Sequence, residues 1–243
     1  MRIATTNQHS NEWFSARCGN CTASRMADAM RKLQRASGSK KAGDWHGDHD
    51  EYVRELAREK LTGIPAWHKV TMEMQYGVEH EDDAREAYGA FTGQQVEQVG
   101  AVIHPRLSYL IASPDGLMGE TGALEIKVPL LSTHMDNLIE DKIPDQYLPQ
   151  MYTVMAVCER EWIDFVSYCP KDPDDDERLM LPDDLRLFIK RLYADQDKFR
   201  EIEEAATATF EEALALVKKL SSRRLNAGVS VEVPQELALG SGE

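Results

Sequence analysis

Two short stretches decide the fold of this chain: Ser113-Pro114-Asp115-Gly116 and Leu124-Glu125-Ile126-Lys127-Val128-Pro129. Apolar and charged residues alternate with period two in the second stretch, which is typical of a β-strand. The apolar residues of segment 109–112 indicate a short buried strand before the first stretch. The glycines between the two stretches indicate a turn. The region therefore predicts a β-hairpin that carries charged side chains inside apolar strand sequence.

The predicted hairpin brings two acids and a lysine together. Glu125 and Lys127 are two residues apart, so they share one face of the strand, and pairing across the hairpin places Asp115 near them. Two carboxylates this close repel each other unless a cation lies between them. A divalent metal ion with oxygen ligands would neutralise such a pair. The alternative is an exposed hairpin whose acids and lysine form an ordinary ion pair.

The spacing Pro-Asp, nine residues, Glu-x-Lys resembles the PD-(D/E)xK nuclease motif. In that motif two acids hold magnesium, and the lysine helps to position and activate the attacking water. Pro-Asp and Glu-x-Lys are common in soluble proteins, so the bare pattern does not separate a nuclease from an ion-paired hairpin. The rest of the sequence has to decide between them.

The composition is that of a globular enzyme. Of the 243 residues, 42% are hydrophobic and 29% are charged, which is ordinary for a chain that can bury one sizeable core. No apolar run resembles a signal peptide or reaches the ~18 residues that a membrane span needs. We expect a soluble cytoplasmic protein with no membrane partner.

The charge is unevenly distributed. The net charge of -14 argues against nucleic acid, but residues 25–41 hold six basic residues against one acid, a net +5. Residues 172–184 hold seven acids against one arginine, a net -6. A local basic surface on an acidic exterior suits a protein that grips phosphate at one place. The alternative is two ordinary solvated loops.

Four cysteines do not predict a metal centre. Cys18 and Cys21 form a Cys-x-x-Cys pair, whereas ten residues separate Cys158 from Cys169. Structural zinc usually needs a second pair at similar spacing. We expect four reduced thiols.

A candidate phosphate site precedes the helix predicted over residues 25–34. Thr22 or Ser24 is suited to be its N-cap, and the free amides of a helix N-terminus attract anions. Arg17 lies seven residues before Ser24 and would add a positive charge. The alternative is a plain helix cap beside a surface arginine.

A carboxylate interrupts the apolar stripe of the helix predicted over residues 71–91. Glu81 falls at helical spacing with Met74, Val78 and Tyr88. An ionised carboxylate on a core-facing stripe costs several kcal/mol unless a partner compensates it. That partner is a metal ion or an arginine such as Arg85, and the sequence leaves both open.

The remaining segments mix helices and strands. Periodicity predicts helices over 52–61 and 144–158, strands over 94–103 and 161–169, and a long amphipathic helical region over 182–224. The composition of residues 37–50 predicts a flexible loop. No repeat or internal linker divides the chain, so we expect one domain over residues 1–225 and a flexible tail over 226–243.

Several separate segments resemble, in the same order, the phage lambda exonuclease family, the viral-type alkaline exonucleases of DNA recombination. The resemblance covers roughly residues 11–170 and is weak in the loop, the acidic stretch and the tail. It rests on Trp13-Phe14-Ser15-Ala16-Arg17 with Thr22-Ala23-Ser24, on residues 76–85, on Ala112 to Leu117, on Leu124 to Pro129 and on Tyr147-Leu148-Pro149-Gln150. The resemblance implies an α/β (α+β) fold with a restriction-endonuclease-like core, in which helices flank a mixed central β-sheet.

The resemblance also implies roles for the charged residues. Asp115 and Glu125 would be metal ligands together with the backbone carbonyl of Ile126, and Glu81 would lie near a second metal. Lys127 would orient the attacking water. The implied cofactor is Mg²⁺, two ions per site, for which Mn²⁺ can substitute.

Further residues would bind the substrate. Gln150 would contact the active-site phosphate or water. Arg17 and Ser24, with Thr22 and Ser113, resemble a pocket that receives a 5′-phosphate. The expected reaction is magnesium-dependent 5′-to-3′ digestion of the 5′-phosphorylated strand of double-stranded DNA, leaving 3′ overhangs.

The expected biological setting also follows from the resemblance. It implies a homotrimeric ring around duplex DNA, a single-strand annealing recombinase as partner, and a phage or prophage protein in the cytoplasm of a bacterial host. Two alternatives stay open: a site-specific or structure-specific endonuclease of the same fold, and a non-catalytic acidic protein that mimics DNA.

Overall fold

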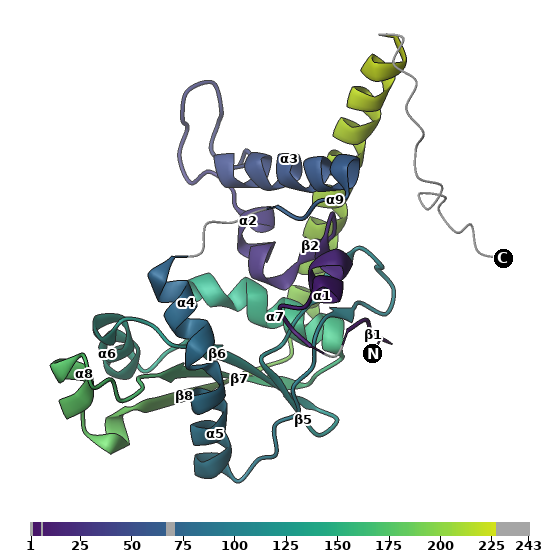
Figure 1. Ribbon diagram of the computed structural model, residues 1–243. Coiled ribbons are helices and arrows are strands. Elements are labelled where there is room, and N and C mark those ends of the chain that lie inside the picture. The colour runs from purple at the N-terminus through teal and green to yellow at the C-terminus, as the bar shows by residue number, and fades with distance from the viewer. Residues whose placement is uncertain (1, 6, 67–70, 227–243) are drawn as a thin grey trace.

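The protein combines two small β-sheets with surrounding helices (Figure 1). The structure, a computed structural model, describes residues 2–5, 7–66 and 71–226. The predicted tail, residues 226–243, lies outside these ranges apart from its first residue. The mixed α/β fold class is confirmed, with the predicted central sheet divided in two.

The first sheet has the strand order β1-β3-β4-β2. Strand β2 runs parallel to β4, and the other neighbours are antiparallel. The strands are short and span Arg2–Ile3 (β1), Val102–Ile103 (β3), Leu110–Ala112 (β4) and Cys21–Thr22 (β2). The parallel pair brings residues 21–22 beside the strand that leads into Ser113.

The second sheet has the order β5-β6-β7-β8 and is also mixed, because β6 and β7 are parallel. Its strands span Gly116–Met118 (β5), Gly122–Lys127 (β6), Trp162–Tyr168 (β7) and Leu187–Tyr193 (β8). The predicted hairpin is β5 and β6, with Gly116 opposite Leu124. Residues 113–115 join β4 to β5, so the hairpin begins where the two sheets meet.

Helices cover both sheets. Figure 1 shows α2, α3 and α9 at one end of the molecule and the second sheet at the other, with α7 between them. The helices span Asn11–Arg17 (α1), Met26–Met30 (α2), Gly47–Thr62 (α3), Met72–Glu79 (α4), Glu81–Thr92 (α5), Leu131–Glu140 (α6), Leu148–Cys158 (α7), Asp176–Met180 (α8) and Gln196–Asn226 (α9). Within the described part of the chain, no helix has the length and apolar composition that a membrane span requires.

The two faces of β6 pack against different helices. Leu124 and Ile126 join a buried cluster with Tyr88 of α5. Ala123 belongs to the larger core that includes Met151 of α7. Because side chains alternate along a strand, Glu125 shares the α7 face with Ala123.

The predicted helix over residues 182–224 is wrong in its first part, which forms strand β8. Phe188 packs into the larger core, whereas Leu187 and Ile189 pack against the α5 cluster. Apolar residues lie on both faces of this partly buried strand, so their spacing imitates that of a helix. Pairing with all seven residues of β7 decides the outcome.

The single helix predicted over residues 71–91 is two helices, α4 and α5, that meet at His80. His80 has φ -109° and ψ 8°, outside the helical region, and its Nδ1 lies 2.8 Å from Oδ2 of Asp83. Met74 and Val78 are exposed. The predicted continuous core-facing stripe is therefore wrong, because the break at His80 separates the exposed residues of α4 from the buried face of α5.

Three other boundaries differ from prediction. Of the strand predicted over residues 94–103, only Val102–Ile103 (β3) forms. Helix α2 ends at Met30 rather than at residue 34. Helix α3 begins at Gly47, inside the predicted loop 37–50. The His46 side chain accepts a hydrogen bond from the Asp48 amide and so caps α3, although histidine is not a common N-cap residue.

Candidate active site

Glu125 is the most deeply buried carboxylate of the hairpin, with no exposed surface. Its Oε1 pairs with Nζ of Lys127 and accepts a hydrogen bond of 2.5 Å from Nε2 of Gln150 on α7. Its Oε2 is buried and has no hydrogen-bond partner among the described residues. A buried carboxylate oxygen without a partner is costly, and a bound cation would remove that cost.

Asp115 lies in the turn between β4 and β5 and faces β6. Its Oδ2 accepts a hydrogen bond of 2.6 Å from the amide of Ile126, and its own amide donates to the Leu124 carbonyl at 3.2 Å. The next residue, Gly116, leaves no room for a side chain, because an added Cβ would lie 2.2 Å from Cγ1 of Val96. The hairpin thus fixes Asp115 beside β6, as predicted.

Glu81 is the first residue of α5, and the arginine named as one of its two possible partners lies beside it. Its Oε1 lies 2.6 Å from Nη2 of Arg85, so the arginine partner left open by the sequence exists. Nε of Arg85 also donates to the Asp115 carbonyl at 3.0 Å. Arg85 therefore ties Glu81 to the turn that carries Asp115.

Asp115, Glu125 and Glu81, here called the acid cluster, perturb one another. Burial raises the pKa of Glu125 to about 7, and the charges of Asp115 and Glu81 add to the rise while Lys127 opposes it. Burial and then the charge of Asp115 raise the pKa of Glu81 to about 7, and burial raises the pKa of Asp115. The cluster thus holds more negative charge than its cations neutralise.

Lys127 stays protonated in this setting. Burial disfavours its charged form, but the carboxylates of Glu125 and Asp115 outweigh burial and raise its pKa. A single lysine charge shared by two acids leaves negative charge uncompensated.

The acid cluster fits a divalent metal ion. The partnerless Oε2 of Glu125 and the raised carboxylate pKa values are what a dication would relieve. Among the described residues, no group of three or more His, Cys, Asp or Glu side chains is arranged to hold a metal ion, so the fit rests on Asp115 and Glu125. An ion there would need further oxygens from water, a backbone carbonyl or a phosphate, which is the usual habit of magnesium.

The four residues predicted to bind a 5′-phosphate come together. Arg17 Nη1 lies 3.3 Å from Ser113 Oγ, and Arg17 Nη2 lies 3.3 Å from Ser24 Oγ. Thr22 Oγ1 lies 3.5 Å from Ser24 Oγ. Burial lowers the pKa of Arg17 to about 10, so it remains a cation at neutral pH.

Sequence reasoning from the residues assigned no role to Trp13, which completes this group. Its Nε1 donates to Ser113 Oγ at 2.8 Å, and the Arg17 guanidinium lies 4.2 Å from its ring centroid. The signal was the spacing of four residues, which places Trp13 and Arg17 on one face of α1. We call Trp13, Arg17, Thr22, Ser24 and Ser113 the phosphate pocket.

The predicted helix cap in this pocket is wrong. Thr22 precedes a three-residue 3₁₀ turn, Ala23–Arg25, and makes no side-chain capping hydrogen bond. Ser24 lies inside that turn. Because a turn this short has little dipole, the pocket depends on the arginine and the hydroxyl groups instead.

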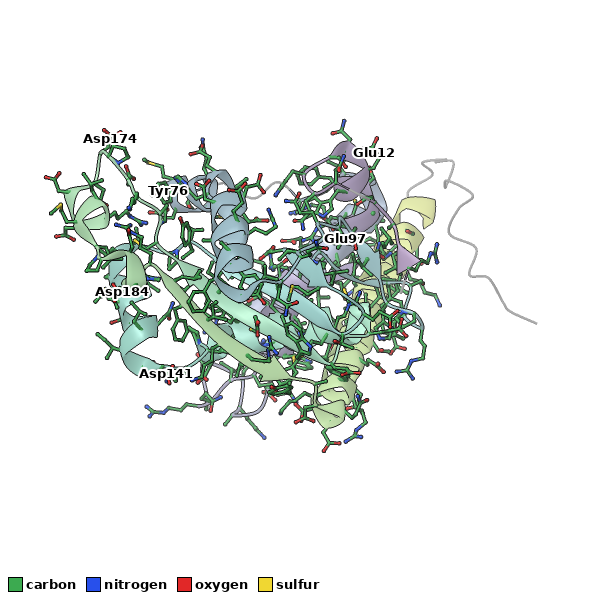
Figure 2. All side chains as sticks on the ribbon, turned by 90° about the horizontal axis from the view of Figure 1, so that it is seen from below. Glu12, Tyr76, Glu97, Asp141, Asp174 and Asp184 are labelled. Carbon is green, nitrogen blue, oxygen red and sulfur yellow. The ribbon has the colours of Figure 1, made fainter. Side chains whose placement is uncertain are left out.

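The charged stretches differ in their surroundings. In the basic stretch, Arg31 pairs with Asp48, Lys40 pairs with Asp50 and Arg25 lies 3.3 Å from Glu55, so α3 neutralises part of it. Figure 2 shows Asp174 and Asp184 of the acidic stretch on the opposite side of the molecule from Glu12 of α1. The acidic stretch is therefore remote from the phosphate pocket.

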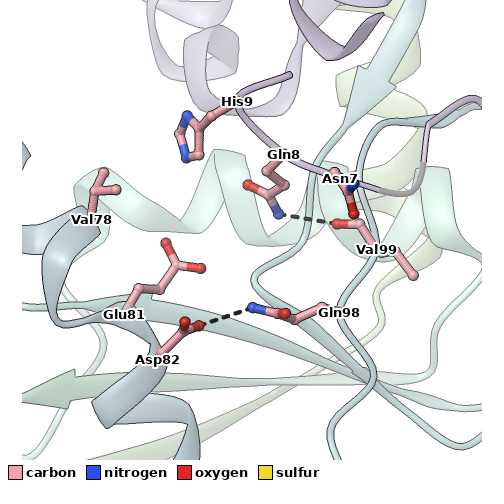
Figure 3. A pocket seen from close by; sticks show the side chains of 8 residues that line it. All are labelled: Asn7, Gln8, His9, Val78, Glu81, Asp82, Gln98 and Val99. Atoms are coloured by element: carbon pink, nitrogen blue, oxygen red, sulfur yellow. Dashed lines mark hydrogen bonds between the residues drawn. The ribbon is translucent and has the colours of Figure 1, made fainter. Parts of the chain in front are cut away.

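A cavity of about 490 Å³ opens beside the acid cluster (Figure 3). Glu81 and Asp82 of α5 line one side, and the N-terminal segment Asn7, Gln8 and His9 lines the other. Sequence reasoning missed this segment, since no pattern connects residues 7–9 with the acids.

The cysteines agree with prediction. All four are free, and Cys21, Cys158 and Cys169 are buried.

Comparison with known proteins identifies relatives of this chain. Residues 12–161 match the YqaJ-like viral recombinase domain. The chain is 37% identical to the alkaline exonuclease LHK-Exo from Laribacter hongkongensis, with a TM-score of 0.76 over 90% of this chain and 100% of that one. LHK-Exo in complex with dAMP gives the same identity and coverage and a TM-score of 0.77.

A phage-related exonuclease from Haemophilus somnus 129PT is more distant. It is 19% identical, with a TM-score of 0.65 over 83% of this chain and 96% of that one, and at this identity the likeness supports the fold alone. No curated protein sequence matches the chain.

Proposed function

This chain belongs to the YqaJ-like viral recombinase family and is an exodeoxyribonuclease of the alkaline exonuclease type, and we propose that it digests the 5′-phosphorylated strand of duplex DNA in the 5′-to-3′ direction. The product would be duplex with 3′ single-stranded overhangs. The resemblance to the phage lambda exonuclease family is confirmed by these relatives.

One observation carries the proposed polarity. The phosphate pocket and the acid cluster share the segment Ser113-Pro114-Asp115. Ser113 accepts hydrogen bonds from Trp13 and Arg17 of the pocket, whereas Asp115 accepts one from the Ile126 amide of β6. A strand whose terminal 5′-phosphate is held by Arg17 would have its next phosphate close to the acids. Hydrolysis there removes one nucleotide from the 5′ end.

The metal part of the proposal rests on the acid cluster. Asp115 and Glu125, with the Ile126 carbonyl, would hold a magnesium ion, and Glu81 would lie near a second one. When bound, magnesium supplies Lewis-acid chemistry that lowers the pKa of the attacking water and stabilises charge on the phosphate. The partnerless Oε2 of Glu125 supports this assignment.

The protein's own residues would position the reactants. Lys127 remains a cation beside Glu125, so its ammonium can donate hydrogen bonds to the attacking water and to a phosphate oxygen. Gln150 fixes the Glu125 carboxylate through Oε1. Water attacks phosphorus, the bond from phosphorus to the 3′-oxygen breaks, and that oxygen leaves with a proton. The shortened strand then has a new 5′-phosphate, which can enter the phosphate pocket.

The assembly and partners are further proposals. Family membership supports a homotrimeric ring around duplex DNA, a single-strand annealing recombinase as partner, and action in the bacterial cytoplasm as a phage or prophage protein. Light scattering measures the molar mass of the purified full chain in solution. A homotrimeric ring requires three times the mass of one chain.

Digestion of linear duplex tests the proposed function. One strand carries a 5′-phosphate and the other a 5′-hydroxyl, and magnesium is added or chelated. We expect magnesium-dependent loss of the phosphorylated strand only. Loss of the hydroxyl strand first would reject the preference for a 5′-phosphate, and equal cutting of closed circular duplex would favour the endonuclease alternative.

A further inference from the structure

His9 has a strained backbone that no helix end explains. Three non-glycine residues in the described ranges have positive φ: His9 at 60°, Asp141 at 46° and Glu159 at 55°. Asp141 and Glu159 are the C-caps of α6 and α7, where the left-handed conformation is common. His9 instead precedes Ser10, the N-cap of α1. Strain of this kind persists only where the surroundings enforce it.

The neighbours of His9 enforce its position. Nε2 of Gln8 donates to the carbonyl of Pro114 at 2.9 Å and to that of Val99 at 3.2 Å. On the other side, Oγ of Ser10 accepts a hydrogen bond of 3.1 Å from the Trp13 amide. The hydrogen bond from Gln8 thus holds the turn at His9 against Pro114, the residue that precedes Asp115.

The imidazole of His9 lies between the phosphate pocket and the acid cluster. Its ring centroid is 5.1 Å from that of Trp13, with the two planes inclined by 45°. His9 also lines the same cavity as Glu81 of the acid cluster. The ring therefore adjoins both regions.

The cavity beside His9 has the size and lining of a ligand site. Figure 3 shows His9 and Glu81 on opposite sides of the cavity, with Val78 at its edge. Its volume of about 490 Å³ lies within the range of small-molecule pockets. The polar groups of Gln8 and Gln98 and the apolar Val78 suit a ligand that is partly polar and partly apolar, as a nucleoside is.

We propose that His9 is a substrate-binding residue that holds the nucleoside part of the terminal nucleotide between the phosphate pocket and the acid cluster. This rests on the proposed function, because one nucleotide separates a 5′-phosphate in the pocket from the bond to be cut. A ring N–H of His9 donates a hydrogen bond to the sugar or base, and Val78 contributes apolar contact. The ligand class is a deoxynucleoside 5′-monophosphate.

Binding of dAMP and of deoxyadenosine to the full chain, measured by calorimetry, tests this proposal. His9→Gly removes the imidazole and the backbone strain together, and it should weaken both ligands about 3- to 10-fold, as expected for one lost hydrogen bond. Arg17→Ala should instead remove the advantage of dAMP over deoxyadenosine. His9→Asn, which tolerates positive φ and keeps a donor, should recover part of the binding.

Asp141→Gly is the matched control, because it removes a positive-φ residue on α6 that lines no part of the cavity. It should leave dAMP binding unchanged. Wild-type affinity of His9→Gly for dAMP, or an equal loss of affinity in Asp141→Gly, would overturn the role of His9. The proposed function would still stand if the wild type digests 5′-phosphorylated duplex. A wild-type chain that neither digests this duplex nor binds dAMP would overturn both.

Discussion

The acid cluster and the phosphate pocket adjoin through Ser113-Pro114-Asp115, yet their contacts differ. In the acid cluster, Asp115 and Glu125 accept hydrogen bonds of 2.6 and 2.5 Å, and Glu125 is fully buried. In the phosphate pocket, the contacts of Arg17 with Ser24 and Ser113 are 3.3 Å long, and Ser24 is exposed. Bonds of 3.3 Å are weak, so the Arg17 donors are available to a ligand.

The difference supports a division of labour in the proposed reaction. Tight contacts would hold the acid cluster in one geometry, as chemistry requires, whereas loose contacts would let the phosphate pocket take up and release strand ends. Changes in the first region should therefore affect the rate of hydrolysis, and changes in the second should affect the choice of end.

The largest effect is expected from Asp115→Asn. Loss of one carboxylate charge at the metal site should reduce hydrolysis by about 10³-fold or more, because several kcal/mol of transition-state stabilisation disappear. Binding of 5′-phosphorylated duplex should persist. Single-turnover cleavage and a binding assay check this, with Asp83→Asn on the exposed face of α5 as control. Near-normal cleavage by Asp115→Asn would remove Asp115 from the mechanism.

Arg17→Ala should have a smaller effect that falls on the phosphate pocket. The preference for a 5′-phosphate over a 5′-hydroxyl should drop about 10- to 100-fold, since charge-assisted hydrogen bonds are worth ~1.5–3 kcal/mol. The rate on the hydroxyl end should change little. Arg106→Ala, which breaks an exposed ion pair with Glu203, is the control. An unchanged preference in Arg17→Ala would reject the pocket.

Gln150→Ala should reduce the rate by about 3- to 10-fold, the value of one hydrogen bond to the Glu125 carboxylate. Preference for the 5′-phosphate should stay unchanged, because Gln150 belongs to the acid cluster side. Gln146→Ala, an exposed glutamine one turn earlier, provides a control. A shift in end preference without a loss of rate would contradict the division of labour.

The smallest effect concerns stability and pH in the metal-free protein. The pKa of Glu125 rises from its ordinary 4.5 to about 7 on folding, so between these values the folded state binds more protons than the unfolded state. The free energy of unfolding should therefore fall as the pH rises from 4.5 to 7. Urea denaturation in a chelator should show a steeper fall for the wild type than for Glu125→Gln. Equal slopes would mean that Glu125 is not protonated on folding.

The hairpin could be predicted because its signals are local. The alternation in β6 and the turn residues before it lie within about a dozen residues, and one register satisfies both. Arg17, Thr22 and Ser24 could be predicted as a candidate phosphate site from local sequence, whereas Ser113 needed the family resemblance because it lies 96 residues after Arg17. His9 escaped prediction because only the folded chain brings it near Asp115.

Other secondary-structure predictions were wrong because one pattern of residues is compatible with two secondary structures. The apolar spacing of residues 185–192 suits an amphipathic helix and also a strand with apolar residues on both faces, and pairing with β7 selects the strand. The sequence singled out Glu81 because it shares helical spacing with Met74 and Val78, but both of these residues are exposed, so no core-facing stripe exists. Glu81 nevertheless lies close enough to Asp115 for the charge of Asp115 to raise its pKa. Helical spacing cannot reveal a one-residue break such as that at His80.

The size of the first product is the strongest test of how the phosphate pocket and the acid cluster are placed. If one nucleotide bridges the phosphate pocket and the acid cluster, duplex with a labelled 5′-phosphate should release its label as a deoxynucleoside 5′-monophosphate in the first turnover. Release of the label as an oligonucleotide or as free phosphate would contradict the placement of the two regions one nucleotide apart.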